Sequence, residues 1–169
     1  TVIGQFRLKD GRACYFLPSS LDINPVGAAT LARDKDSASR FMSHMGYRIV
    51  EGKAFTLSGT SARQRNRTID RAYRFAIHLG LPVIVKPNSN SRGHGVVLTH
   101  TKDEFYDAVE DIFAYDRVAL MQRKANGKDY RIVVLDRIII TACERRPLSV
   151  TGDGRSTIEA LLHQKHMSF

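Results

Sequence analysis

A lysine followed by a loop of small polar residues is the strongest chemical pattern in this sequence. Lys86 comes at the end of a short run, residues 83–85, that is too short for a helix. Pro87 closes the run, and proline cannot donate to a strand ladder. The loop that follows consists of serine, asparagine and glycine, which let the backbone approach a ligand closely. Backbone N–H groups in such a turn bind anions, and an ammonium group beside them suits phosphate.

The same residues also fit a plainer interpretation, a β-hairpin with a polar loop and a surface lysine. The loop is not a P-loop, because no Gly-Lys-Ser/Thr follows it and no helix follows directly. It is not a dinucleotide-binding fingerprint either, because a strand rather than a helix comes next. Both the phosphate-binding loop and the plain hairpin stay open on these residues alone.

Composition and charge narrow the class of protein. The 169 residues are 43% hydrophobic and 25% charged, which is typical of a globular chain. The net charge of +9 predicts an anionic partner: a nucleotide, a nucleic acid or an acidic polymer. No apolar run approaches the ~20 residues of a membrane helix, so we expect no membrane partner. We interpret Cys14 and Cys143 as buried, reduced thiols and expect a cytoplasmic protein. No pattern indicates an oligomeric state.

The elements that must position Lys86 follow from hydrophobic spacing and cap residues. Asp34, either Thr60 or Ser61, and Thr101 precede apolar residues at helical spacing, as N-caps do. A tight turn at Asp136 and Arg137 separates two apolar runs. We expect a hairpin within residues 6–17, strands at 47–50, 83–85, 96–98, 118–122, 130–135 and 138–144, a turn at 51–52, and helices at 34–45, 61–79, 101–113 and from 158 onward.

Hairpins beside helices favour an α+β fold over a doubly wound parallel sheet. The sequence before Asp116 is richer in helices and the sequence after it is antiparallel, so we place a boundary there. Two facing lobes would bring Lys86 and the strand ending at Gln122 to opposite sides of one cleft. Because the chain lacks a starting Met and ends inside a helical pattern, we expect it to be a piece of something longer. The expected parts are a lead-in hairpin segment 1–27, a first lobe 28–116 and an incomplete second lobe 117–169.

Three segments in this order, residues 86–96, 122–131 and 150–158, resemble an ATP-grasp protein. The likeness is nearest to cyanophycin synthetase and to the fused glutathione synthetase type, and it covers most of the chain from about Ala28. It implies two small α+β lobes with antiparallel sheets around a nucleotide cleft. It also implies ATP as cofactor and a ligase that joins a small-molecule or peptide carboxylate to an amine through an acyl-phosphate.

The resemblance also implies roles for individual residues. Lys35 and Lys86 would reach the nucleotide phosphates and act in catalysis, Ile84 would lie against adenine, and Asp129 would hold the ribose. The loop would close over the triphosphate through Ser89, Asn90, Ser91, Gly93, His94 and Gly95. The adenine hinge would consist of Gln122, Arg123, Lys124 and Ala125.

The sequence departs from the family pattern at several points. Asn90 stands where glycine is usual, and asparagine tolerates a left-handed backbone. Gln122 replaces the usual glutamate, and its amide oxygen can still accept from the adenine amino group. The family holds magnesium with an Asp and a later Glu-x-Asn, and no such segment occurs here. We therefore assign no metal ligand and expect Mg²⁺ only in the complete protein.

Two other functions remain open. The missing carboxylates and the net charge also fit a non-catalytic module that binds nucleotides or anions. Nucleic-acid binding ranks below both, because the sequence has no zinc knuckle, recognition-helix pattern or basic strand with aromatic residues. Besides the net charge, its support is an arginine stripe, and such a stripe is usually the solvated side of a helix. The stripe consists of Arg63, Arg67, Arg71 and Arg74.

Overall fold

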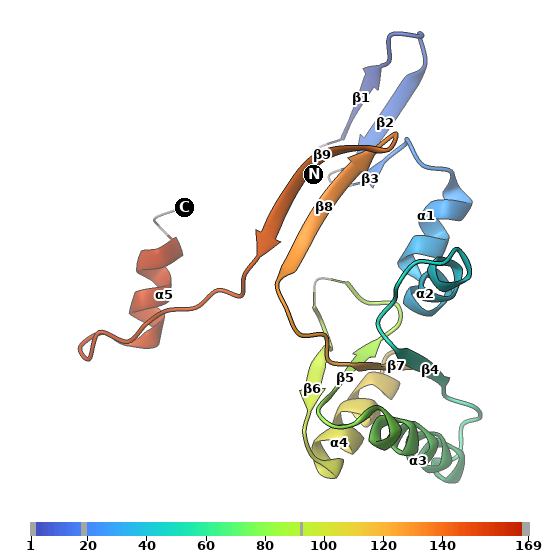
Figure 1. Ribbon diagram of the computed structural model, residues 1–169, viewed down its shortest axis with the longest axis vertical. Helices are drawn as coiled ribbons and strands as arrows, with labels where there is room; N and C mark the ends of the chain where they lie inside the picture. The colour runs from blue at the N-terminus through green and yellow to red at the C-terminus, as the bar shows by residue number, and fades with distance from the viewer. Residues whose placement is uncertain (1–2, 18–19, 92, 167–169) are drawn as a thin grey trace. The chain divides into compact units, whose positions relative to one another are not determined.

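The computed structural model describes residues 3–17, 20–91 and 93–166, and the chain divides into two compact units, residues 1–125 and 126–169 (Figure 1). The first unit contains β1 (Gly4–Arg7), β2 (Ala13–Leu17), β3 (Ser20–Leu21), α1 (Val26–Arg33), α2 (Lys35–His44), β4 (Gly52–Thr56), α3 (Ala62–Leu79), β5 (Val83–Pro87), β6 (Val97–Thr99), α4 (Lys102–Phe113) and β7 (Val118–Arg123). The second contains β8 (Asp129–Leu135), β9 (Ile138–Arg145) and α5 (Ile158–His166).

A four-stranded antiparallel sheet in the order β4-β7-β5-β6 forms the centre of the first unit. Helices α3 and α4 pack against one face of this sheet (Figure 1). The apolar stripes of these two helices and the inward side chains of the strands form one core. Its largest fully buried members include Phe105, Ile69, Leu79, Ile112 and Met121. The fold is therefore α+β with antiparallel sheets, as the sequence predicts.

Alternation along β5 separates the core from a second face of the sheet. Val83 and Val85 are 0% exposed and belong to the core with α3 and α4. Ile84 and Lys86 therefore point to the other face, since successive side chains of a strand alternate. Gln122 pairs with Ile84, and Leu120 pairs with Lys86, so these two also lie there. We call this surface, formed by Ile84, Lys86, Leu120 and Gln122, the site face.

The helix starts confirm the cap residues read from sequence. The Ser61 hydroxyl accepts from the Gln64 amide in a complete capping box at the start of α3. The Thr101 hydroxyl caps α4, and the Asp34 carboxylate caps α2. Each cap satisfies backbone donors that the first helical turn leaves without partners. No described helix is both long and apolar enough to cross a membrane.

The strand expected at residues 47–50 is wrong, and so is the turn at residues 51–52. The strand is β4, which begins at Gly52 and pairs with β7. A Cβ atom at Gly52 would come within 2.6 Å of the Met121 carbonyl oxygen, so the close pairing requires glycine. This glycine permits a strand contact where the sequence pattern indicates a turn. Helix α1 was also not predicted.

The position expected for the Gln122 strand is also wrong. β7 does not face Lys86 from another lobe but lies directly beside β5, with five paired residues from Val83–Arg123 to Pro87–Ala119. The chain divides between Ala125 and Asn126, after β7 rather than at Asp116.

The second unit is a long hairpin followed by a helix. Asp136 and Arg137 have φ of 48° and 70°, and two positive values in a two-residue loop fit the hairpin's twist. The predicted tight turn is therefore confirmed. Thr157 caps α5 through its hydroxyl, which accepts from the Ala160 amide. The expectation that both cysteines are buried holds for Cys14 and is wrong for Cys143, which lies exposed on β9.

Candidate functional site

Lys86 lies on the site face at the end of β5 and is half-buried. Its ammonium makes no hydrogen bond or ion pair with any residue that the structure describes. Burial lowers the pKa of the Lys86 ammonium, and the positive charge of Lys35 lowers it further. The two lysines, 51 positions apart in the numbering, are therefore close enough to repel each other.

Lys35 reaches the site from the first residue of α2. Its ammonium donates to the carbonyl oxygen of Asn88 at 2.7 Å and also to that of Asn90. Burial lowers the pKa of Lys35, and the carboxylates of Asp116 and Asp34 act in the opposite direction. The predicted convergence of Lys35, Lys86 and the start of the loop is thus present in the geometry.

Asp116 fastens the first loop residue to the sheet. One of its carboxylate oxygens accepts from both the backbone amide and the hydroxyl of Ser89, at 2.9 and 2.7 Å. The other accepts from the Val118 amide at 3.0 Å, at the start of β7. Burial alone would raise the pKa of Asp116, but these hydrogen bonds bring it below its usual value.

The tip of the loop, Ser91 with residues 93–96, in contrast makes hydrogen bonds only within itself among the described residues. The His94 amide donates to the Ser91 carbonyl, and the Val96 amide donates to the Gly93 carbonyl. Gly93 and Gly95 have φ of 78° and 70°, a conformation that favours glycine. Both glycines predicted for the loop therefore have the positive φ that a tight turn of the backbone uses. Arg92 lies outside the described residues.

The His94 side chain does not extend freely from the loop. Its ring lies 5.9 Å from the ring of Tyr115, centroid to centroid. A Cβ atom at Gly95 would collide with the Tyr115 hydroxyl, so the loop packs closely on this tyrosine. Burial raises the pKa of the Tyr115 hydroxyl above its usual value.

The hinge residues follow β7. The Gln122 side chain is half-buried on the site face, beside Ile84 on the paired strand. The Arg123 guanidinium is occupied elsewhere, because it donates to the Glu51 carboxylate at 2.8 Å and to the Leu79 carbonyl at 2.7 Å. Lys124 and Ala125 are exposed and belong to no strand. The Arg123 side chain is therefore already engaged, whereas the Gln122 side chain and the backbone of the segment are placed to serve a ligand.

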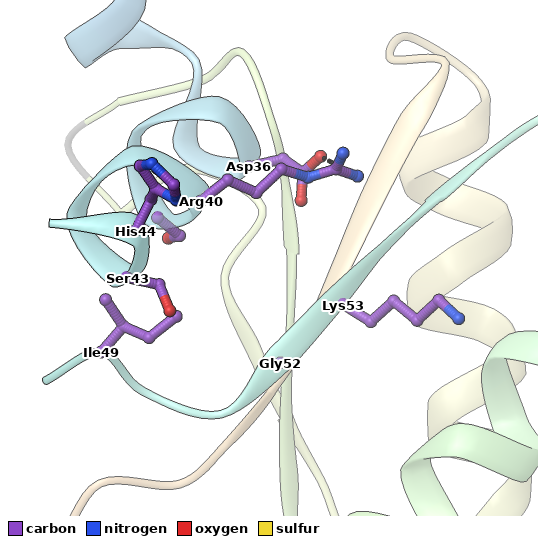
Figure 2. A pocket seen from close by; sticks show the side chains of 8 residues that line it. Asp36, Arg40, Ser43, His44, Ile49, Gly52 and Lys53 are labelled. Carbon is purple, nitrogen blue, oxygen red and sulfur yellow. Dashed lines mark ion pairs between the residues drawn. The ribbon is translucent and has the colours of Figure 1, made fainter. Parts of the chain in front are cut away.

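A cavity of about 440 Å³ lies between α2 and β4 (Figure 2). The Arg40 guanidinium reaches back along α2 to the Asp36 carboxylate at 3.0 Å, and Gly52 forms part of the β4 wall. Figure 2 shows the Lys53 side chain pointing away from α2, as its alternate position on β4 requires. The cavity extends along the edge of the site face, since Gly52 pairs with Gln122.

Asp129 belongs to the second unit, where it is the first residue of β8. Its carboxylate accepts from the Arg145 guanidinium at 2.7 Å on the paired strand. The candidate ribose ligand is therefore held in a defined position within its own hairpin. Among the described residues, no group of three or more His, Cys, Asp or Glu could hold a metal ion.

Sequence reasoning missed Asn88 as a site residue, and it treated Asp34 and Asp116 only as a helix cap and a boundary. All three are short polar residues at the ends of secondary structure, where such residues are common. The signal available in the sequence was the run of consecutive polar residues after Pro87. The sequence does not show that these residues have different environments in the fold.

The site formed by Lys35, Lys86 and the loop suits a polyphosphate. It offers two neighbouring ammonium groups, one of which lacks a partner among the residues described, beside a glycine-containing loop. Residues of these types bind phosphate through charge and backbone N–H groups. The apolar Ile84 and the Gln122 amide next to them extend the same face with groups that suit a planar base.

Comparison with known proteins shows the family and the fold. Residues 41–151 match the model of the family described as D-ala D-ala ligase C-terminus. A D-alanine–D-alanine ligase from Shouchella clausii is 33% identical over 112 residues, which are 66% of this chain and 28% of that protein. A cyanophycin synthetase from Trichormus variabilis is 26% identical over 135 residues, 79% of this chain and 14% of that protein.

A solved structure shows the same fold. The D-alanine–D-alanine ligase from Bacillus anthracis complexed with ATP aligns with 73% of this chain and 38% of its own, with a TM-score of 0.55 and 18% identity. The ATP-grasp resemblance is therefore confirmed. This chain spans less than a third of the length of the two curated relatives.

Proposed function

We propose, since this chain belongs to the D-ala D-ala ligase C-terminus family, that its first unit binds the triphosphate of ATP through Lys35 and Lys86. The observation that carries the proposal is the half-buried Lys86 ammonium, which has no hydrogen-bond or ion-pair partner among the described residues and lies beside a second positive charge. Burying like charges together is unfavourable unless an anion compensates them. A triphosphate supplies several adjacent negative charges.

The rest of the site face would hold the nucleoside. Ile84 offers an apolar surface for the adenine ring, and the Gln122 oxygen can accept from the adenine amino group. The backbone of Arg123, Lys124 and Ala125 would bind the edge of the base, since the Arg123 side chain is already bonded to Glu51. Asp129 would hold the ribose, and the β8–β9 hairpin would belong to the second ATP-grasp lobe.

The loop would cover the phosphates. Its root is fixed by Asp116 through Ser89, whereas its tip is bonded only within itself among the described residues. Such a tip can close over a ligand while the root keeps its position. Asn90, Ser91, Gly93, His94 and Gly95 would then line the phosphates, with backbone N–H groups other than that of His94, which already donates to the Ser91 carbonyl, pointing to phosphate oxygens.

The complete protein would be a ligase for a carboxylate and an amine. ATP would supply the phosphoryl group that activates the carboxylate as an acyl-phosphate, and the amine would then displace phosphate to form the amide. Lys35 and Lys86 would stabilise charge on the transferring phosphoryl group and position it. Mg²⁺ is an expectation for the complete protein.

The test is ATP binding to the chain by calorimetry or with a fluorescent ATP analogue. Lys86→Met should weaken binding about 10- to 100-fold, as expected for loss of a charge-assisted hydrogen bond of about 1.5–3 kcal/mol. Lys53→Met is the matched control, because Lys53 lies on the neighbouring part of the sheet but points away from α2. Absence of ATP binding to the unmodified chain, or equal affinity of the two variants, would contradict the proposal.

A non-catalytic nucleotide-binding module would give the same binding results. The two functions separate when ADP release is measured in the complete protein with candidate carboxylates and amines. Turnover that depends on both substrates supports the ligase, and ATP binding without any ADP release supports the module.

A further inference from the structure

Asn88, the first residue after Pro87, has every polar group of its side chain engaged. The residue is 8% exposed. Its amide nitrogen donates to Asp34 Oδ2 at 2.7 Å, and its amide oxygen accepts from the Asp36 backbone amide at 3.1 Å. A buried amide with both ends satisfied holds one orientation, because rotation would lose both bonds.

These bonds join two elements that are distant in sequence. Asp34 Oδ1 caps α2 by accepting from the Ser37 amide at 2.7 Å, while Asp34 Oδ2 holds Asn88. The Asn88 backbone amide donates to the Val118 carbonyl at 3.1 Å, which extends the contact between β5 and β7. Asn88 thus attaches the first turn of α2 to the end of the central sheet.

The attachment determines where two like charges lie. Lys35 follows Asp34 on α2, and Lys86 lies two residues before Asn88 on β5. Their ammonium groups repel each other, so an α2 free to move would carry Lys35 away from Lys86. The Asn88 amide and its carbonyl, which accepts from Lys35 Nζ at 2.7 Å, oppose that movement.

We propose that Asn88 is a positioning residue, which together with Asp34 holds the Lys35 and Lys86 ammonium groups at the spacing that a polyphosphate chain requires. The inference rests on the proposed function and deepens it by naming the pair that orders the phosphate site before the ligand arrives. Both polar atoms of the Asn88 side chain are already bonded to residues at the start of α2, so we expect the side chain to make no contact with the ligand.

An added negative charge at position 88, followed by an exchange of the two residues, tests this pair. Asn88→Asp alone places a carboxylate against the Asp34 carboxylate and should release α2 from the loop. Asp34→Asn with Asn88→Asp restores a donor and an acceptor, and asparagine still caps a helix. Asn66→Asp, an exposed change of the same charge on α3, is the matched control.

Binding of ATP and of tripolyphosphate is measured for the four proteins, with thermal melting and with amide exchange at Asp36. We expect Asn88→Asp to weaken both ligands at least 10-fold and to speed exchange at Asp36. The exchanged pair should recover most of the affinity and the slow exchange, and Asn66→Asp should resemble the unmodified chain.

The outcomes separate the two proposals. If the unmodified chain binds neither ligand, the proposed function fails. If it binds both and Asn88→Asp binds as tightly, only the positioning role is overturned. If the exchanged pair recovers the melting temperature and the slow exchange at Asp36 but not the affinity, holding α2 in place is not what sets the affinity, and the inference is again overturned.

Discussion

The four-stranded sheet of the first unit and the β8–β9 hairpin of the second are both antiparallel and both rich in branched apolar residues. In the sheet, Val83 and Val85 are 0% exposed, because α3 and α4 cover one face. In the hairpin, Ile138 and Ile139 are 65% and 64% exposed, and no described residue after Asn126 is buried. The composition of a strand thus indicates that its apolar side chains favour burial, but it does not indicate which element buries them.

This difference in apolar burial predicts different stabilities for the two units. The first has its own core, which is the main source of folding free energy. The hairpin has backbone ladders but little apolar burial, and isolated two-stranded hairpins are marginal in water. The second unit is therefore expected to be the less stable of the two. The changes below test this difference, from the largest expected effect to the smallest.

Phe105→Ala should give the largest effect. Phe105 is fully buried on α4, with its ring 5.4 Å from that of Tyr73. Losing it should lower the free energy of unfolding by about 3–5 kcal/mol, a large part of the about 5–15 kcal/mol of a typical protein. Denaturant unfolding followed by circular dichroism measures it. Ile139→Ala, in the hairpin, should change the same transition by less than about 0.5 kcal/mol; similar losses in both variants would remove the distinction between the units.

Asp116→Ala tests how far the order of the first unit extends into the loop. The change removes acceptors for Ser89 and Val118 and should cost about 1–3 kcal/mol. Faster amide exchange at Ser89 should accompany the loss. Asp107→Ala, an exposed change on α4, serves as control. Unchanged exchange at Ser89 would show that the loop root is held by other contacts.

Acid should weaken the first unit through the same carboxylates. Hydrogen bonds from Ser37 and Asn88 lower the pKa of Asp34, and those from Ser89 and Val118 hold that of Asp116 below 3.8. Groups with a lowered folded pKa stabilise above the unfolded value and lose this contribution as pH falls through the folded value. Stability should therefore fall below about pH 4. The double variant Asp34→Asn, Asp116→Asn should lose less over this range, and an identical acid profile would contradict the assignment.

Ile138→Thr combined with Ile140→Thr should have the smallest effect on folding. Both side chains are exposed, so the unfolding transition of the first unit should move by less than about 0.5 kcal/mol. The change should instead reduce concentration-dependent association, because it divides an exposed apolar surface. Light scattering over a dilution series measures this, and a clear loss of unfolding free energy would show that the hairpin supports the first unit.

The helices and the lysine loop could be predicted because their signals are local. Ser61 and Gln64 form a cap within one turn, and Asp136 with Arg137 forms a turn by itself. The order of the sheet could not, since the pairing of Gln122 with Ile84 depends on which strands meet after folding.

The same reason explains why the site could be predicted only in part. Lys35, Lys86 and Gly95 belong to a recognisable pattern, whereas the partner of Asn88 lies 54 residues away. Ser89 and Asp116 are 27 residues apart. Polar residues of this kind occur in most loops, so only the folded contacts distinguish the ones that order a site.

The Lys35 ammonium donates to the carbonyl oxygens of Asn88 and Asn90. If the proposed triphosphate site is correct, an anion that reaches Lys35 alone would have to compete with these two dipoles. A chain of linked phosphates that also reaches Lys86 would gain a second attraction, from an ammonium without a partner among the described residues. The carbonyl contacts would then favour linked phosphates over simple anions.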